Sequence, residues 1–93
     1  RKYLRKIGHH LDPIVIIGKQ GMTDMLVRAV HDALEHHELV KIRFNDFKDE
    51  KRDLTGEIER RTGSQIAGII GHVALLYKRQ QDDEKRKIVF PER

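Results

Sequence analysis

A chain of 93 residues is long enough for one domain with a modest core, and 38% hydrophobic and 37% charged residues indicate a globular protein with a densely ionic surface. Cysteine is absent, which excludes disulfides, thiolate metal sites and a cysteine nucleophile. No apolar run approaches the roughly 20 residues of a membrane span and no signal-peptide pattern is present, so we expect a cytoplasmic protein with no membrane association.

The positive charge is concentrated near the N-terminus. The formal net charge is +4, and residues 1–21 alone account for it, because they hold one acidic residue, Asp12, and five basic ones: Arg1, Lys2, Arg5, Lys6 and Lys19. An excess of charge attached to one segment is typical of a surface that binds a polyanion.

The first elements are predicted from hydrophobic spacing. Leu4, Ile7 and Leu11 recur at helical intervals, and the same helix carries a basic face formed by Lys2, Arg5, Lys6 and His9. Asp12-Pro13 ends this helix, since proline lacks an N–H and restricts the residue before it. The apolar run 14–17 follows as a strand, and its β-branched character leads us to expect burial on both faces.

Gly18-Lys19-Gln20-Gly21 joins this strand to a second helix that begins at Thr23 or Asp24. Glycines tolerate positive φ and let the main chain approach a ligand closely, while a helix start offers N–H groups to an anion. With a lysine at its tip, the turn suits phosphate. A strand-to-helix turn can also use two glycines for structural reasons alone, so the pattern by itself leaves both interpretations open.

The second helix is the most regular element, with an apolar stripe made of Met22, Met25, Leu26, Ala29, Val30, Ala33 and Leu34. On its polar side, Arg28 lies one turn from Asp24 and from Asp32. Arg28 is therefore either a partner in an ion pair within the helix or an RNA contact.

The second half of the chain predicts a strand at 40–44 with alternating basic residues, a turn at 45–49 and a third helix at about 50–62. Gly56 weakens that helix and Gly63 ends it. Strands at 66–70 and 73–77 flank Gly71-His72, which favours a type II′ hairpin. Residues 78–87 are expected to form a mobile charged loop, and residues 88–91 a short terminal strand.

The order of elements is thus α-β-α-β-α-β-β in a single domain, 1–93. We predict an α/β fold of the two-layer α+β kind, with a small mixed four-stranded sheet covered by helices. Crossover connections make the first three strands parallel, and the hairpin adds an antiparallel fourth. The glycine turn lies at the C-terminal end of the first strand, where open α/β sheets commonly bind ligands.

The sequence lacks the usual signatures of catalysis. Ser64 has no G-x-S-x-G setting, the histidines show no H-E-x-x-H spacing, and neither the P-loop nor the dinucleotide-binding pattern fits the turn. We therefore expect no enzyme, no metal, no cofactor and no small-molecule substrate. Aromatic residues make up only 5%, so recognition of RNA backbone, as by the G-x-x-G loop of KH modules, is favoured over base stacking. Here, however, the loop joins a strand to a helix instead of two helices.

Taken together, the chain resembles the CRM domain family (chloroplast RNA splicing and ribosome maturation), specifically its bacterial single-domain YhbY-like branch. The resemblance extends from Tyr3 to Pro91. It rests on the order and spacing of short segments: residues 3–5, 10–13, 18–21, 33–41, 61–63, 70–72, 75–78 and 88–91.

The resemblance implies a fold similar to the C-terminal domain of translation initiation factor three. It also implies that Gly18, Lys19, Gln20 and Gly21 form an RNA-contacting GxxG loop, supported by the basic first helix with Lys2, Arg5 and Lys6. Bacterial members are associated with precursors of the large ribosomal subunit and plant relatives with intron splicing. We therefore expect a monomer that binds ribosomal RNA during ribosome assembly; a protein-interaction module on the ribosome and a splicing or RNA-remodelling cofactor are the alternatives.

Overall fold

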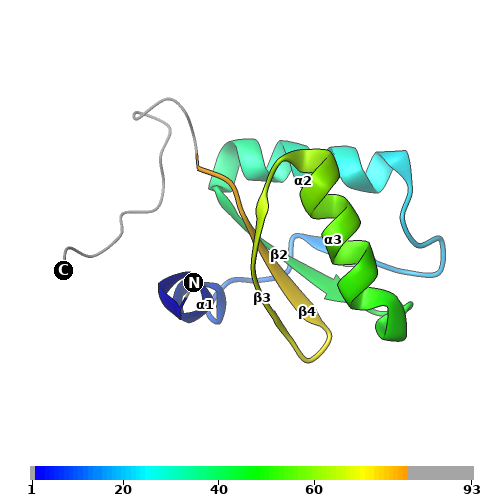
Figure 1. Ribbon diagram of the computed structural model, residues 1–93, viewed down its shortest axis with the longest axis horizontal. Coiled ribbons are helices and arrows are strands. Elements are labelled where there is room, and N and C mark those ends of the chain that lie inside the picture. Colours follow the sequence, from blue (N-terminus) through cyan, green and yellow to red (C-terminus); the bar gives the residue numbers. More distant parts are fainter. Residues whose placement is uncertain (1, 80–93) are drawn as a thin grey trace.

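The computed structural model of the chain describes residues 2–79, so the expected strand at 88–91 and residues 80–87 of the expected loop lie outside this part. Helices and strands follow one another as the sequence predicts (Figure 1). Their bounds are α1 (Lys2–Gly8), β1 (Val15–Ile17), α2 (Asp24–His37), β2 (Leu39–Phe44), the 3₁₀ helix η1 (Lys48–Glu50), α3 (Lys51–Thr62), β3 (Gln65–Ile70) and β4 (Val73–Tyr77).

The strands form one mixed sheet in the order β1-β2-β4-β3. Strand β1 pairs with β2 in parallel, whereas β4 is antiparallel to both β2 and β3. The first three strands therefore run in the same direction, and the predicted α/β fold with a mixed four-stranded sheet is confirmed. The hairpin places β4 inside the sheet. The apolar side chains of β4 pack on both faces of the sheet, and most of them are buried.

The expectation that β1 is buried on both faces is wrong. Val15 and Ile17 are buried, but Ile14 and Ile16 are 50% and 53% exposed. The reason is that β1 lies at the edge of the sheet, and the helix on the second face packs against other strands.

The main core lies between the sheet and the pair α2 and α3. Val40, Ile42 and Phe44 alternate along β2 and point into it, together with Val30, Leu34 and Ile58 from the two helices. Helix α2 is capped by Thr23, whose hydroxyl accepts a hydrogen bond from the Leu26 N–H at 3.0 Å.

Helix α1 covers part of the opposite face of the sheet. Leu4 packs there with Leu39, Ala67, Leu75 and Tyr77, whose side chains alternate with those of the main core. At Gly8 the helix approaches β4 so closely that an added Cβ would lie 2.6 Å from the Leu75 side chain. The glycine thus permits the contact that fixes α1 on the sheet.

Helix α3 continues through Gly56 and ends at Gly63, whose φ of +70° is left-handed, as the sequence predicts. In the hairpin, Gly71 has a φ of +57° and His72 does not have a positive φ, as a type II′ turn requires.

Gly56→Ala should stabilise the protein by about 1 kcal/mol, because alanine loses less conformational freedom in a helix. An added Cβ at this position meets only the Arg60 guanidinium, at an ordinary contact distance of 3.5 Å. Urea unfolding followed by circular dichroism measures the difference. An unchanged or lower midpoint would show that α3 requires a glycine here for a reason other than space.

Candidate nucleic-acid interface

The Gly18–Gly21 segment forms a β-turn between β1 and the cap of α2. It is closed by a hydrogen bond of 3.0 Å from the Gly21 N–H to the Gly18 carbonyl. Lys19 and Gln20 occupy the two corner positions, and both are exposed. Gly21, at the last position of the turn, has a φ of +66° and needs to be glycine, whereas Gly18 does not have a positive φ.

The two glycines therefore have different roles. A Cβ at Gly18 would meet nothing within 4 Å, so this side of the main chain is open to a ligand. A Cβ at Gly21 would lie 3.1 Å from the Phe47 ring, which fills the space left by the missing side chain. The N–H groups of Asn45 and Asp46 also donate to the Ile17 carbonyl, so segment 45–47 holds the turn in place.

Lys19 is the cation that the turn itself presents. Within residues 2–79 it forms no ion pair, so its charge is free to meet an external anion. The N-terminus of α2 attracts an anion less strongly than the sequence suggests. The Thr23 side chain caps the helix, and Asp24 adds a carboxylate to its first turn. The backbone at Gly18 and the Lys19 ammonium are therefore the main features that suit a phosphate.

Acidic side chains limit the approach to the turn from one side. The groove formed by residues 45–50 is lined around Phe47 by three acidic side chains, Asp46, Asp49 and Glu50, and by one cation, Lys48, so its charge is negative. Such a groove repels a polyanion, since like charges at close range are unfavourable. A nucleic-acid chain that touches Lys19 is thus directed away from η1.

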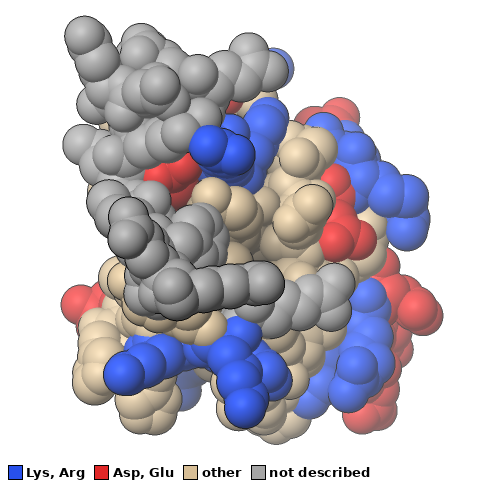
Figure 2. Space-filling model, turned by 60° about the vertical axis from the view of Figure 1, so that its left-hand side comes forward, with Lys and Arg blue, Asp and Glu red and all other residues tan. Residues whose placement is uncertain are grey.

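The basic residues of α1 lie apart from the turn. Figure 1 shows α1 at one end of the molecule and the light-blue turn after β1 at the other. Lys2, Arg5 and Lys6 are exposed. Figure 2, in which the α1 side comes forward, shows Lys and Arg side chains gathered along the lower part of that face. The turn and α1 therefore do not form one compact patch, and a ligand that contacts both must extend along the sheet.

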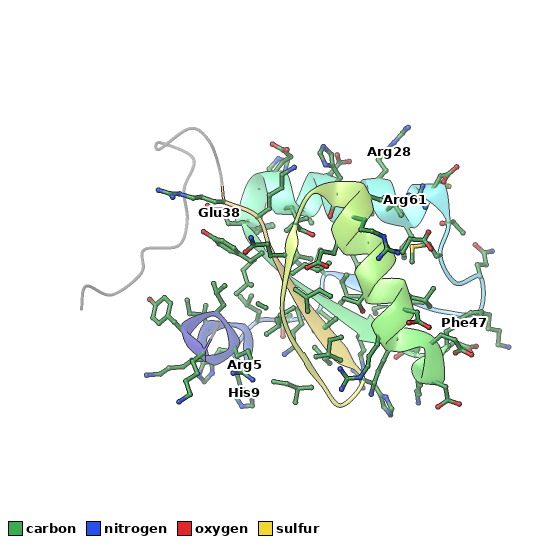
Figure 3. All side chains as sticks on the ribbon, viewed as in Figure 1. Arg5, His9, Arg28, Glu38, Phe47 and Arg61 are labelled. Atoms are coloured by element: carbon green, nitrogen blue, oxygen red, sulfur yellow. The ribbon has the colours of Figure 1, made fainter. Side chains whose placement is uncertain are left out.

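Arg28 lies on yet another side. In Figure 3 its side chain points outward from α2, on the opposite side of the molecule from Arg5. The ion pair with Asp24 that the sequence left open is not formed, because Asp24 pairs with Arg61 of α3 at 2.7 Å. That hydrogen bond raises the pKa of the Arg61 guanidinium. Arg28 is exposed and unpaired within residues 2–79, but it is separate from the α1 surface.

Strand β2 supplies two cations that were expected to alternate along the strand but were not predicted as site residues. Lys41 and Arg43 lie on the sheet face that α1 covers, between α1 and the C-terminal end of β1. Arg43 is exposed, and Lys41 donates from Nζ to the Leu11 carbonyl at 3.0 Å. The alternation of Lys41 and Arg43 with buried residues is the signal that could have added them.

Other kinds of site have little support in the described structure. No group of histidine and acidic side chains within residues 2–79 is arranged to hold a metal ion. In the same part of the chain, every helix is too short or too polar to cross a membrane.

The sequence of this chain is similar to those of known proteins. Residues 1–78 match the profile of the CRS1 / YhbY (CRM) domain. A Haemophilus influenzae protein named "RNA-binding protein" is 33% identical over 92 residues, which cover 98% of this chain and 90% of that protein. Bacillus subtilis "Probable RNA-binding protein YqeI" is 32% identical over 92 residues, covering 98% and 94%.

The fold is shared with a solved structure as well. The solution structure of Staphylococcus aureus SAV1595, described as a candidate RNA-binding protein, superimposes with a TM-score of 0.76 at 30% identity. The alignment covers 95% of this chain and 93% of that one. The chain therefore belongs to the CRM domain family and resembles its bacterial single-domain members.

Gly21→Ala should destabilise the protein by about 1–2 kcal/mol, because alanine is strained at positive φ and its Cβ would crowd Phe47. Gly18→Ala is the matched control, and its free energy of unfolding should stay within about 0.5 kcal/mol of the parent. Urea denaturation of the three proteins makes the comparison. Equal losses at both positions would contradict the different roles assigned to the two glycines.

Proposed function

We propose that this protein is a non-catalytic binder of structured RNA that contacts the phosphate backbone through the Gly18–Gly21 turn. The observation that carries the proposal is the geometry of that turn. It presents exposed Lys19 and Gln20 beside main chain that has open space at Gly18. Charge-assisted contacts to phosphate need a cation and an accessible backbone, and both are present here.

The relatives support the same function. Two proteins that align with nearly the whole chain are named for RNA binding. The match to the CRS1 / YhbY (CRM) domain spans residues 1–78 and so includes the glycine turn. The net charge of +4, held by the N-terminal segment, adds a long-range attraction for RNA.

We propose ribosomal RNA in precursors of the large ribosomal subunit as the target, with the protein acting as a monomer in the cytoplasm during ribosome assembly. The basis for this finer assignment is the resemblance to YhbY-like proteins. Binding to protein-free fragments of large-subunit ribosomal RNA tests it directly. A module that docks only on ribosomal proteins would fail to bind such fragments.

The first test is the salt dependence of binding to a structured ribosomal RNA fragment, measured by fluorescence anisotropy. If about four phosphates are contacted, log affinity should fall with log salt concentration with a slope of about −3 to −4. Lys19→Ala should make that slope shallower by about one unit, since one phosphate contact is lost. Arg60→Ala removes the same charge from an exposed position near the end of α3 and should leave the slope unchanged. An identical slope for Lys19→Ala and the parent would remove Lys19 from the interface.

The second test separates binding from folding at Gly18. Gly18→Asp should leave the circular dichroism spectrum and unfolding midpoint intact, because its Cβ enters open space. RNA affinity should fall by about tenfold or more, because the new carboxylate faces the phosphate and neutralises Lys19. Gly18→Ala, which adds a methyl group without charge, should weaken binding by a smaller factor, because the methyl group takes up part of the space through which a phosphate would approach the main chain. Full RNA affinity in Gly18→Asp would show that the backbone at this turn does not touch RNA.

A further inference from the structure

A second feature of the surface lies on the sheet, away from the turn. Helix α1 covers only one end of its sheet face. Beyond it a row of residues crosses all four strands, and no helix within residues 2–79 packs over this row. The register places Ile16 opposite Arg43, Arg43 opposite Val73, and Val73 opposite Ile70. Ile70 is 59% exposed, so a large apolar side chain lies bare on this face.

A cleft of about 160 Å³ opens where α1 meets this bare end of the sheet. It is lined by Arg5, Gly8, His9, Lys41, Ile70, Val73 and the buried Leu75. Figure 3 shows Arg5 and His9 on the side of α1 that faces the β3–β4 hairpin. The walls of the cleft are thus polar on the α1 side and apolar on the hairpin side.

Two glycines shape this cleft. Gly8 brings the end of α1 into contact with Leu75, so that the helix stops just where the bare strands begin. Gly68 leaves room on β3 for the aliphatic part of Arg5, whose Cδ lies 2.7 Å from where a Cβ would be. The Arg5 side chain therefore lies across the sheet at the cleft instead of extending into solvent away from it.

The charge around the cleft has one sign. Arg5 and Lys41 line it, Arg43 lies opposite Val73 at its edge, and no acidic side chain is part of its walls. Lys41 donates to a neutral carbonyl, so its charge is not cancelled by that contact. Within residues 2–79, none of these three cations forms an ion pair.

An apolar wall that faces cationic side chains matches one nucleotide, with its base against the apolar wall and its phosphate near the cations. A protein cavity of about 150 Å³ holds one benzene ring, so the cleft suits a small ring system and excludes a helix. A base within a duplex is stacked and cannot enter, whereas bases of loops, bulges and ends can be splayed out.

We propose that this cleft holds a single unpaired nucleotide of the bound RNA. Its base lies against Ile70 and Val73, and its phosphate is held by Arg5 and Lys41. The proposal rests on the proposed function, because it assigns a second contact for the same RNA. Since the cleft and Arg43 lie between α1 and the glycine turn, the RNA would extend along the bare sheet from one to the other.

The test compares a short single-stranded RNA with a blunt-ended RNA duplex of equal length, each titrated into the full chain with isoleucine methyl groups and backbone amides labelled for NMR. Both RNAs should shift the amides of residues 18–21. Only the single strand should shift the Ile70 methyl, through the ring current of the base, while the buried Ile58 methyl serves as an internal reference.

A variant provides the second readout. Ile70→Gln should weaken single-strand binding about fivefold and leave duplex binding unchanged, since only the base contact is lost. Ile14→Gln is the matched control, because Ile14 is 50% exposed and lies outside the cleft walls. It should bind both RNAs with parental affinity.

The outcomes separate the two proposals. Shifts at residues 18–21 without any at Ile70, or equal Ile70 shifts with both RNAs, would overturn the nucleotide cleft and leave the proposed function in place. An Ile70→Gln variant that loses duplex and single-strand binding equally would also overturn it. If neither RNA shifts any signal, the proposed function itself fails, and the cleft proposal fails with it.

Discussion

The alternation of side chains along β2 determines what the two faces of the sheet can do. Val40, Ile42 and Phe44 enter the core under α2 and α3, so Leu39, Lys41 and Arg43 must point to the other side. Because β2 lies between β1 and β4, this second face is central to the molecule. A register slip of one residue would bury two cations and expose the core, which keeps the basic side chains on the surface.

The same constraint explains why the proposed interface is extended. The glycine turn follows Ile17, the end of β1 that pairs with Phe44 of β2. Helix α1 packs near Leu39 and Tyr77, at the opposite end of β2. The sheet surface between them carries Arg43 and the exposed Ile16, which pair across β2 and β1. A polyanion that follows the positive charge from Lys19 to Arg5 therefore crosses this surface, while the acidic groove at residues 45–50 opposes the other direction.

Most of the fold could be predicted from the sequence, because local patterns specify the elements. The spacing in α2, the glycine that ends α3 and the Gly71-His72 hairpin needed only neighbouring residues. The position of β4 inside the sheet and the exposure of Ile16 could not be predicted, since they depend on which strands pair and how far α1 reaches. The bracing of Gly21 by Phe47 is a contact across 26 positions that no local pattern signals.

The candidate site, like the fold, could be predicted from the sequence only in part. The turn was predicted because its glycines and lysine are consecutive, and the structure shows it exposed, although its contact with RNA stays a prediction. The separation of Lys19 from Lys2, Arg5 and Lys6 was not predicted, because charge along a sequence does not give distance in space. Lys41 and Arg43 lie between them on β2. The sequence shows that these two residues share one face of the strand, but only the structure shows that α1 packs on that same face of the sheet.

Photo-crosslinking of the protein to a structured ribosomal RNA fragment, followed by mass spectrometry of the crosslinked peptides, tests the central claim most directly. The account predicts crosslinks at residues 18–21 and on the α1 face of the sheet, with α3 free of them. Crosslinks confined to α3 and η1, or their absence from residues 18–21, would contradict it.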